Sequence, residues 1–464
     1  MTMTMRVKAS STIKPAAPTP KHRLWLSDLD LIMPLTHATI IYFYKPNNPN
    51  TTTSFFSPDI MKNSLSQTLV HFYPLAGRLR YDESGRLEID CNEAGVIFNE
   101  AESDVDIDDF GDFKITPELR DLAPHVDYTT RITEWPLVLL QLTVFRHGGV
   151  SLGFATSHTA MDGPSAAHFL CTWAKIACTG KADICIPLCL DRTLLRVRDP
   201  SIKPAFEHEE FKPPPRLDHG GDEGERRKET TVEMFKLTYQ QVNAMREAAN
   251  MGRSSATGPR FSRYESIAAH IWRSTCKARG LEDDQMTELQ IAVQGRNRLH
   301  PPLPVGFIGN VVFRETVVAR SGDLVTGPVG HVAGRIKEVL EKMKDKYLRS
   351  TLDFLNGQED LTPLRSGAHT LGCNQGKFYG CPNMVLTSWL GMPFYDADFG
   401  WGPPMYMGPS TLANDGKGYI IPAKKEDDGG VIIALCLQTK HMEELKELLL
   451  SKDDYGLSWF GHEP

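Results

Sequence analysis

The segment from position 199 to 228, near the middle of the chain, differs in composition from everything around it. It contains Pro213-Pro214-Pro215 and then a run of glycines and charged residues. Such a composition cannot bury enough apolar surface to fold by itself. At 464 residues the chain is also longer than one hydrophobic core usually serves. We therefore expect two lobes, residues 1–198 and 229–464, joined by a crossover linker at 199–228.

Both expected lobes mix short strands with amphipathic helices. Runs rich in β-branched and aromatic residues predict strands, and apolar residues at helical spacing predict helices. Neither common type of glycine-rich phosphate loop is present. The sequence thus predicts an α/β (α+β) protein with mixed sheets. The predicted strands are 37–44, 149–156, 232–237, 289–293 and 431–437, and the predicted helices begin at Pro58 and after Ser165 or cover 240–249, 261–279, 329–355 and 440–451.

The motif His158-Thr-Ala-Met-Asp162-Gly163 follows the short apolar strand at 149–156. A histidine at a strand end, held by a sharp turn, is well placed to act as a general base. The alternative is a partly buried histidine that hydrogen-bonds to its own turn. Because the His-x-x-x-Asp spacing is common, the spacing alone favours the alternative.

A second motif, Asp398-Phe-Gly400-Trp401-Gly402, lies far along the chain. Together the two motifs resemble the BAHD family of plant acyl-CoA-dependent acyltransferases. The resemblance implies a two-lobed fold like that of chloramphenicol acetyltransferase, with an active-site channel where the lobes meet. Other collinear matches extend it over most of the chain: Phe72-Tyr-Pro-Leu-Ala-Gly-Arg-Leu79, Tyr264-Glu265, His270-Ile-Trp272, Arg296 and Gly309-Asn310.

Acyl transfer from a thioester needs a deprotonated nucleophile, a site for the oxyanion and exclusion of water. His158 can supply the base. The sequence has no Gly-x-Ser-x-Gly elbow and no cysteine in a catalytic motif, so direct attack in a ternary complex is the simplest mechanism. Trp401 either forms a wall of the acceptor pocket or donates its indole N–H to the tetrahedral intermediate. Coenzyme A thioester is expected as a co-substrate, with no cofactor and no metal.

The remaining motif residues are expected to shape the site. Asp162 invites a triad interpretation, but its place in a turn before Gly163 suggests that it holds the loop, and the resemblance implies pairing with an arginine. Asp398 has the same ambiguity, and an ion pair with Arg296 would lock the two motifs together. Gly400 and Gly402 would allow the backbone to bend.

Contacts to coenzyme A are expected from a polar loop that contains Ser254, Ser255 and Thr257 and precedes Arg260. Hydroxyl groups of this kind suit phosphate and pantetheine. The loop is equally compatible with ordinary surface.

The segment Ser388-Trp-Leu-Gly391 bears on the acceptor. The resemblance implies that shikimate and quinate enzymes carry an arginine at the place of Gly391, where it grips the acceptor carboxylate, and hydroxyl-bearing residues at the places of Ala38 and Ile40. Glycine cannot form that bidentate pair. The interpretation favours spermidine as the acceptor, as in the spermidine hydroxycinnamoyltransferases, with amide formation. The alternative is transfer to a hydroxyl acceptor such as shikimate or quinate.

The net charge, the hydrophobicity and the cysteine content indicate which binding partners and which cellular compartment to expect. The net charge of −7 gives no general basic field for nucleic acid. No window approaches the roughly 20 apolar residues that span a bilayer. Nine cysteines without tight pairing fit a reducing cytosol. Cys171, Cys178, Cys185 and Cys189 allow a zinc site, but buried thiols are favoured. We expect a cytoplasmic monomer that binds neither membrane nor nucleic acid.

Overall fold

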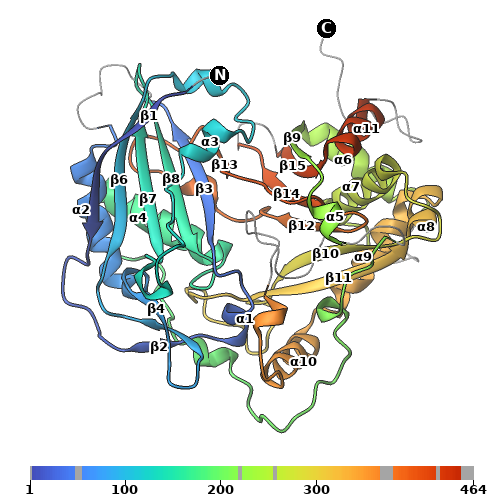
Figure 1. Ribbon diagram of the computed structural model, residues 1–464, viewed down its shortest axis with the longest axis horizontal. Coiled ribbons are helices and arrows are strands. Elements are labelled where there is room, and N and C mark those ends of the chain that lie inside the picture. The colour runs from blue at the N-terminus through green and yellow to red at the C-terminus, as the bar shows by residue number, and fades with distance from the viewer. Residues whose placement is uncertain are drawn as a thin grey trace.

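Two six-stranded sheets, each with helices on its outer side, form the two lobes of the protein. In Figure 1 the first lobe lies on the left and the second on the right, with the sheets facing each other across the middle. The computed structural model describes residues 3–46, 55–217, 222–253, 259–365, 380–424 and 429–450.

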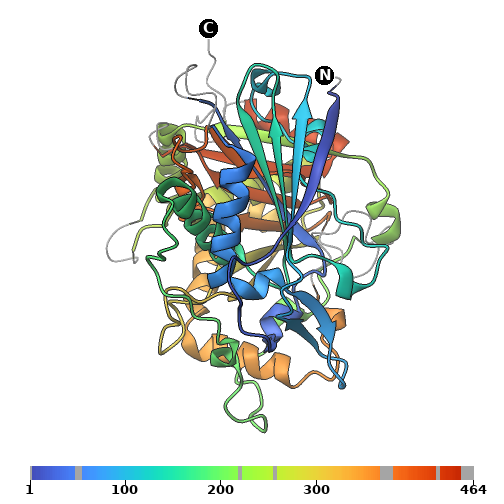
Figure 2. The same cartoon turned by 90° about the vertical axis from the view of Figure 1, so that its left-hand side faces the viewer.

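The first sheet is built almost entirely from the N-terminal part of the chain. Helix α2 (Pro58–His71) lies across its outer face, as Figure 2 shows, and packs beside α4 (Gly163–Thr179). Both helices contribute apolar side chains to the first core. The strand order is β1 (Met5–Ile13), β6 (Val96–Ser103), β7 (Val138–Val144), β8 (Val150–Ser157), β3 (His37–Tyr44) and β13 (Tyr406–Pro409).

The second sheet carries the second core. Helix α7 (Arg263–Arg279) is central to its outer layer and buries Ile267, Ala268, Ile271 and Trp272. The strand order is β11 (Val312–Arg320), β10 (Met286–Gln294), β12 (Met384–Ser388), β14 (Lys417–Pro422), β15 (Val431–Gln438) and β9 (Thr230–Leu237). The other helices on this side are α6 (Tyr239–Ala249), α8 (Ser321–Thr326), α9 (Val329–Lys342) and α11 (Thr439–Leu450).

Smaller elements close the ends of the lobes. A three-stranded sheet consists of β2 (Arg23–Trp25), β5 (Leu87–Asp90) and β4 (Arg78–Tyr81). Three short helices are α1 (Asp28–Leu31), α3 (Pro117–Asp121) and α5 (Asp222–Arg226).

Local signals explain where α7 begins and ends. The Ser262 hydroxyl oxygen accepts a hydrogen bond from the Glu265 amide, and the Glu265 carboxylate accepts one from the Ser262 amide, so both N-terminal donors are satisfied. Gly280 ends the helix with φ of 58°, a left-handed conformation that glycine adopts without strain. The predicted helix 261–279 is confirmed to within two residues.

The predicted single helix at 329–355 is wrong, because the chain breaks into α9 and α10 (Asp345–Asn356). Met343 leaves the helical conformation with ψ of 57°. Arg298 donates to the carbonyl oxygens of Leu340 and Met343, at 3.0 and 2.9 Å, and so satisfies acceptors that the α9 terminus leaves open. The break therefore depends on a residue more than 40 positions away.

Each lobe contains a segment from the other side of the expected linker, so the two halves of the sequence do not correspond fully to the two lobes. Strand β13 pairs with β3, and the preceding residues, including Phe399, pack in the first core. The Tyr44 hydroxyl donates to the Ala397 carbonyl at 2.8 Å. In return, Leu29 of α1 is buried in the second core. The Asp-Phe-Gly-Trp-Gly motif, expected on the C-terminal lobe, therefore lies against the N-terminal one.

The crossover linker is anchored rather than loose. In Figure 1 its first part runs along the lower edge of the molecule, whereas α5, near its end, lies beside the second sheet. The buried His208 ring hydrogen-bonds with Glu210 at 2.8 Å and with Ser350 of α10 at 2.9 Å. The Tyr347 hydroxyl donates to Glu210 at 3.0 Å. These contacts fasten the linker to the second lobe.

Candidate active site

A pocket lies between the facing sheets and takes its lining from both lobes. The first lobe contributes Ala38, Thr39 and Ile40 of β3 together with the turn from His158 to Pro164. The second lobe contributes one face of its sheet. The lining residues on that face are Gln290, Ala292, Gln294, Val312, Arg314, Val385, Thr387, Lys417 and Tyr419.

Backbone contacts fix His158 at the pocket wall. The residue directly follows β8, and its amide donates to the Thr36 carbonyl at 3.0 Å. Its carbonyl accepts a hydrogen bond from the Asn310 side chain at 2.9 Å. Because both peptide groups are engaged, the imidazole projects from a rigid position at the interface of the lobes.

The environment keeps the His158 imidazole neutral. Burial is the main reason that the pKa of His158 falls below its ordinary value of 6.5, and the charge of Lys417 acts in the same direction. Hydrogen bonds and the Asp162 carboxylate partly oppose the fall in this pKa. A neutral imidazole is the form that accepts a proton, so His158 is ready to act as a general base at neutral pH.

Asp162 holds the turn and is bound to an arginine. Arg296 donates from two nitrogens to the two carboxylate oxygens, at 2.7 and 2.9 Å, and the Val311 amide donates at 3.0 Å. The Ser165 amide donates at 3.1 Å, so Asp162, not the predicted Ser165, caps α4. Burial alone would raise the pKa of Asp162, but these partners reverse the effect and lower it. The ion pair implied by the resemblance is present.

The predicted ion pair between Asp398 and Arg296 is wrong. Asp398 is exposed and accepts the backbone N–H groups of Gly400 and Gly402, at 2.8 and 2.9 Å. Both glycines have positive φ, 99° and 102°, which side-chain-bearing residues rarely adopt. The motif is therefore a tight turn closed by its own aspartate, and its distant partner was misassigned.

Trp401 belongs to an aromatic cluster of the first lobe and is not among the described residues that line the pocket. Its ring lies 4.8 Å from the Phe56 ring and 5.9 Å from the Phe55 ring, measured between centroids. The tryptophan that does line the pocket is Trp389, whose ring lies 5.0 Å from the Tyr419 ring. The expected wall is thus formed by a different residue.

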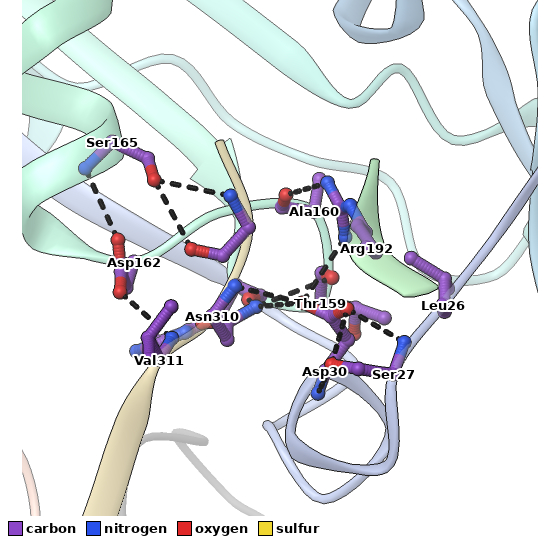
Figure 3. Close-up of polar contacts among 12 residues, drawn as sticks. Leu26, Ser27, Asp30, Thr159, Ala160, Asp162, Ser165, Arg192, Asn310 and Val311 are labelled. Carbon is purple, nitrogen blue, oxygen red and sulfur yellow. Dashed lines mark hydrogen bonds and ion pairs between the residues drawn. The ribbon is translucent and has the colours of Figure 1, made fainter. Parts of the chain in front are cut away.

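A buried polar network beneath the turn was missed in the sequence. Figure 3 shows Asp30 between Ser27 and Asn310, below the loop that carries Thr159. Asp30 accepts from the Asn310 amide and side chain, both at 2.8 Å, and pairs with Arg192 at 3.1 Å. Arg192 also donates to the Ala160 carbonyl at 2.6 Å. The Ser27-x-x-Asp30 spacing, a helix-capping signal, would have identified Asp30 as structural.

The residues predicted to line the acceptor pocket do not all lie there. Ala38 and Ile40 line the pocket as predicted, whereas Gly391 is exposed and absent from the described lining. Gly391 has φ of 81°, and a Cβ built there would meet nothing within 4 Å. A Cβ on Gly163 would approach the Met392 sulfur to 2.8 Å, so this glycine makes room for a pocket side chain.

The predicted coenzyme A contacts Ser254, Ser255 and Thr257 lie outside the described residues. Residues 102–113 carry several acidic side chains but do not contribute to the described lining of the pocket. Among them, Asp108 pairs with Lys45 and Asp112 pairs with Lys236.

The prediction of buried thiols in this cysteine cluster is wrong, because Cys178 and Cys185 are exposed and Cys171 and Cys189 are only partly buried. No group of three or more potential metal ligands occurs among the described residues. None of the helices in the described ranges has the length and apolar character to cross a bilayer.

Comparisons with known proteins agree with this geometry. A model of the family described as Transferase family matches residues 3–449. A shikimate O-hydroxycinnamoyltransferase from Nicotiana tabacum is 46% identical over 96% of this chain and 99% of its own. A hydroxycinnamoyl-CoA:piscidic acid hydroxycinnamoyltransferase from Actaea racemosa is 44% identical over 95% and 98%. The crystal structure of vinorine synthase, 23% identical, superposes with a TM-score of 0.70 over 98% of this chain and 100% of that one.

These relatives overturn the predicted spermidine acceptor. The first is named for O-acylation of shikimate and the second for transfer to piscidic acid. The argument against an acidic acceptor, drawn from Gly391, Ala38 and Ile40, assumed that only the Gly391 position could supply a cation, and these relatives contradict the spermidine acceptor that it favoured. The family match over nearly the whole chain, the two motifs and the shared two-lobed fold establish that this chain belongs to the BAHD family of acyl-CoA-dependent acyltransferases.

Proposed function

We propose that the protein transfers a hydroxycinnamoyl group from its coenzyme A thioester to a hydroxyl group of a small acceptor, forming an ester. The observation that carries the proposal is the rigidly held, neutral His158 in a pocket lined by both lobes. The names of the relatives supply the acyl group and the O-acylation.

His158 would act first as base and then as acid. Its ring accepts the hydroxyl proton as the acceptor oxygen attacks the thioester carbonyl, which gives a tetrahedral oxyanion. When this intermediate collapses, the carbon–sulfur bond breaks and the ester is released. The coenzyme A thiolate takes the proton back from His158, so the enzyme ends each cycle unchanged and no acyl-enzyme is required.

The charge of the pocket supports a hydroxyl over a polyamine acceptor. Arg314 and Lys417 both line it. Asp162 is the sole carboxylate among the described lining residues, and Arg296 already neutralises it. An alkyl ammonium, with a pKa near ~10, would enter this region as a cation. A hydroxyl group enters uncharged.

The test is to incubate the enzyme with coumaroyl-CoA and shikimate, quinate or spermidine, and to identify the products by mass spectrometry. We expect an ester with a hydroxyl acceptor, with a turnover that falls about 10²–10⁴-fold in His158→Ala. Lys236→Met, a surface change outside the pocket, is the matched control. Amide formation without ester would reject the proposal.

A further inference from the structure

Lys417 occupies a position in the second sheet from which its side chain enters the pocket. In register it pairs with Val385 of β12, and Val385 pairs with Gln290 of β10. All three line the pocket, so this row of the sheet presents its side chains to the site. Tyr419, two residues along the same strand, also lines the pocket, as the alternation of side chains along a strand requires.

The lysine is buried, which is unusual for this residue type. Its side chain is 5% exposed, and its ammonium lies 5.1 Å from the centre of the Tyr419 ring. Burial lowers the pKa of Lys417 to about 7. A buried lysine in the wall of a pocket, with a pKa shifted by burial, is a candidate for ligand binding.

The fixed charges around the pocket leave it receptive to an anion. Arg314 projects from β11 on the same face and donates to the carbonyls of Ile32 and Leu364, at 3.1 and 2.9 Å. The oxygens of Asp162 are held by Arg296 and by backbone amides. A carboxylate entering the pocket therefore meets positive charge from the second sheet.

We propose that Lys417 is a specificity-determining residue that binds a carboxylate group of the acceptor. The inference rests on the proposed O-acylation and names the acceptor class, a hydroxy acid. It also explains how an acid can be recognised although Gly391 offers no cation. The charge comes from β14 in the floor of the pocket rather than from the loop after β12.

The kinetic test compares an acceptor that carries a carboxylate with its uncharged methyl ester. Shikimate and methyl shikimate are assayed with wild type, Lys417→Met, Lys417→Arg and the surface control Lys236→Met. Loss of a charged hydrogen bond predicts a rise of about 10–100-fold in KM for shikimate in Lys417→Met. The KM of Lys417→Met for methyl shikimate should differ from that of wild type by less than about 3-fold. The KM of Lys417→Arg for shikimate should lie between those of wild type and Lys417→Met.

A binding experiment measures the protonation of Lys417 without any catalytic turnover. At pH 8 a lysine with a pKa of about 7 is mostly neutral, so it must take up a proton when a carboxylate binds. Calorimetric titration of shikimate in buffers of different ionisation enthalpy should show uptake approaching one proton in wild type. Lys417→Arg, whose charge is permanent, and methyl shikimate with wild type should both show far less.

The titratable neighbours do not mask this signal. Burial raises the pKa of Tyr419 well above its ordinary value and raises that of Cys436 to about 11, so both stay protonated at pH 8. The pKa of His158 lies below 6.5, so its ring is neutral at pH 8 in both wild type and Lys417→Arg. Arg314 and the paired Asp162 remain charged throughout.

The outcomes separate the two proposals. If wild type forms no ester with shikimate, methyl shikimate or quinate, the proposed function fails, while the calorimetry still tests Lys417. If Lys417→Met raises KM equally for acid and ester, or if Lys417→Arg takes up as many protons as wild type, the role of Lys417 is overturned. A fall in kcat alone, equal for both acceptors, would point instead to protonation of the leaving thiolate and would also overturn it.

Discussion

Arg296, which follows β10 of the second lobe, clasps both carboxylate oxygens of Asp162, four residues after His158 in the first lobe. The pair is buried, with side-chain exposures of 7% and 1%. It fixes the catalytic turn to the opposite sheet. Asp162 therefore fixes the backbone of the turn that carries His158.

Replacing Asp162 with asparagine should destabilise the fold. The amide can still cap α4, but it leaves the Arg296 charge buried without its partner, which costs about 3–5 kcal/mol. Urea unfolding measures the loss. The acid limb of kcat/KM should move to lower pH, because the Asp162 carboxylate raises the pKa of His158 and an asparagine does not. An Asp162→Asn enzyme of normal stability would contradict the buried ion pair with Arg296.

The pH dependence of catalysis should reflect the lowered pKa of His158. Because burial disfavours the protonated ring, the base remains available below the ordinary value of 6.5 and is lost only at still lower pH. The kcat/KM profile for a neutral acceptor, measured between pH 4.5 and 9, should therefore have its acid limb below 6.5. A limb at or above 6.5 would contradict this environment for His158.

Substitution of Asp398 distinguishes a turn from an ion pair. Asp398→Ala removes the acceptor for two backbone N–H groups and should lower the free energy of unfolding by about 1 kcal/mol. Asp398→Asn keeps an acceptor oxygen and should lose less. If Asp398→Ala cost as much as Asp162→Asn, a buried partner for Asp398 would have to exist.

Glu315 should make the stability of the second lobe depend on pH. Burial, reinforced by the charge of Glu210, raises the pKa of Glu315 to about 7 from an ordinary 4.5. The folded state then holds the proton more tightly than the unfolded chain, so stability is complete below pH 4.5 and declines as pH rises to 7, by about 3 kcal/mol. Glu315→Gln should abolish this decline in thermal unfolding, while the exposed Glu359→Gln should preserve it.

Much of the fold could be predicted from local patterns. The strand at 37–44 and the helix at 261–279 have signals within their own residues, so they were located almost to the residue. The break after α9 could not be located in the same way, because the Arg298 side chain that satisfies the open carbonyl oxygens there comes from the turn after β10. The same limit explains Asp398: the sequence contains the ion-pair residues but does not say which of them meet.

The acceptor site shows the limit most clearly. Gly391 could be compared with a known arginine position, and the comparison led to the wrong acceptor. Lys417 follows a glycine in a polar turn, so the sequence alone suggests an exposed residue at the end of a strand. Only the register of three neighbouring strands shows that its side chain enters the pocket.

The pairing of β13 with β3 limits how substrates can arrive. Tyr406 to Pro409 lie in register opposite Phe43 to Ile40, and Ile40 is part of the pocket wall. A hinge motion that separates the lobes would break the hydrogen bonds between β13 and β3 at the edge of the first sheet. We therefore expect the acyl donor and the acceptor to reach the imidazole without a hinge opening of the lobes. The side chains that line the route should then set which sizes of acyl group and acceptor are accepted, so substituting them is the way to alter the products.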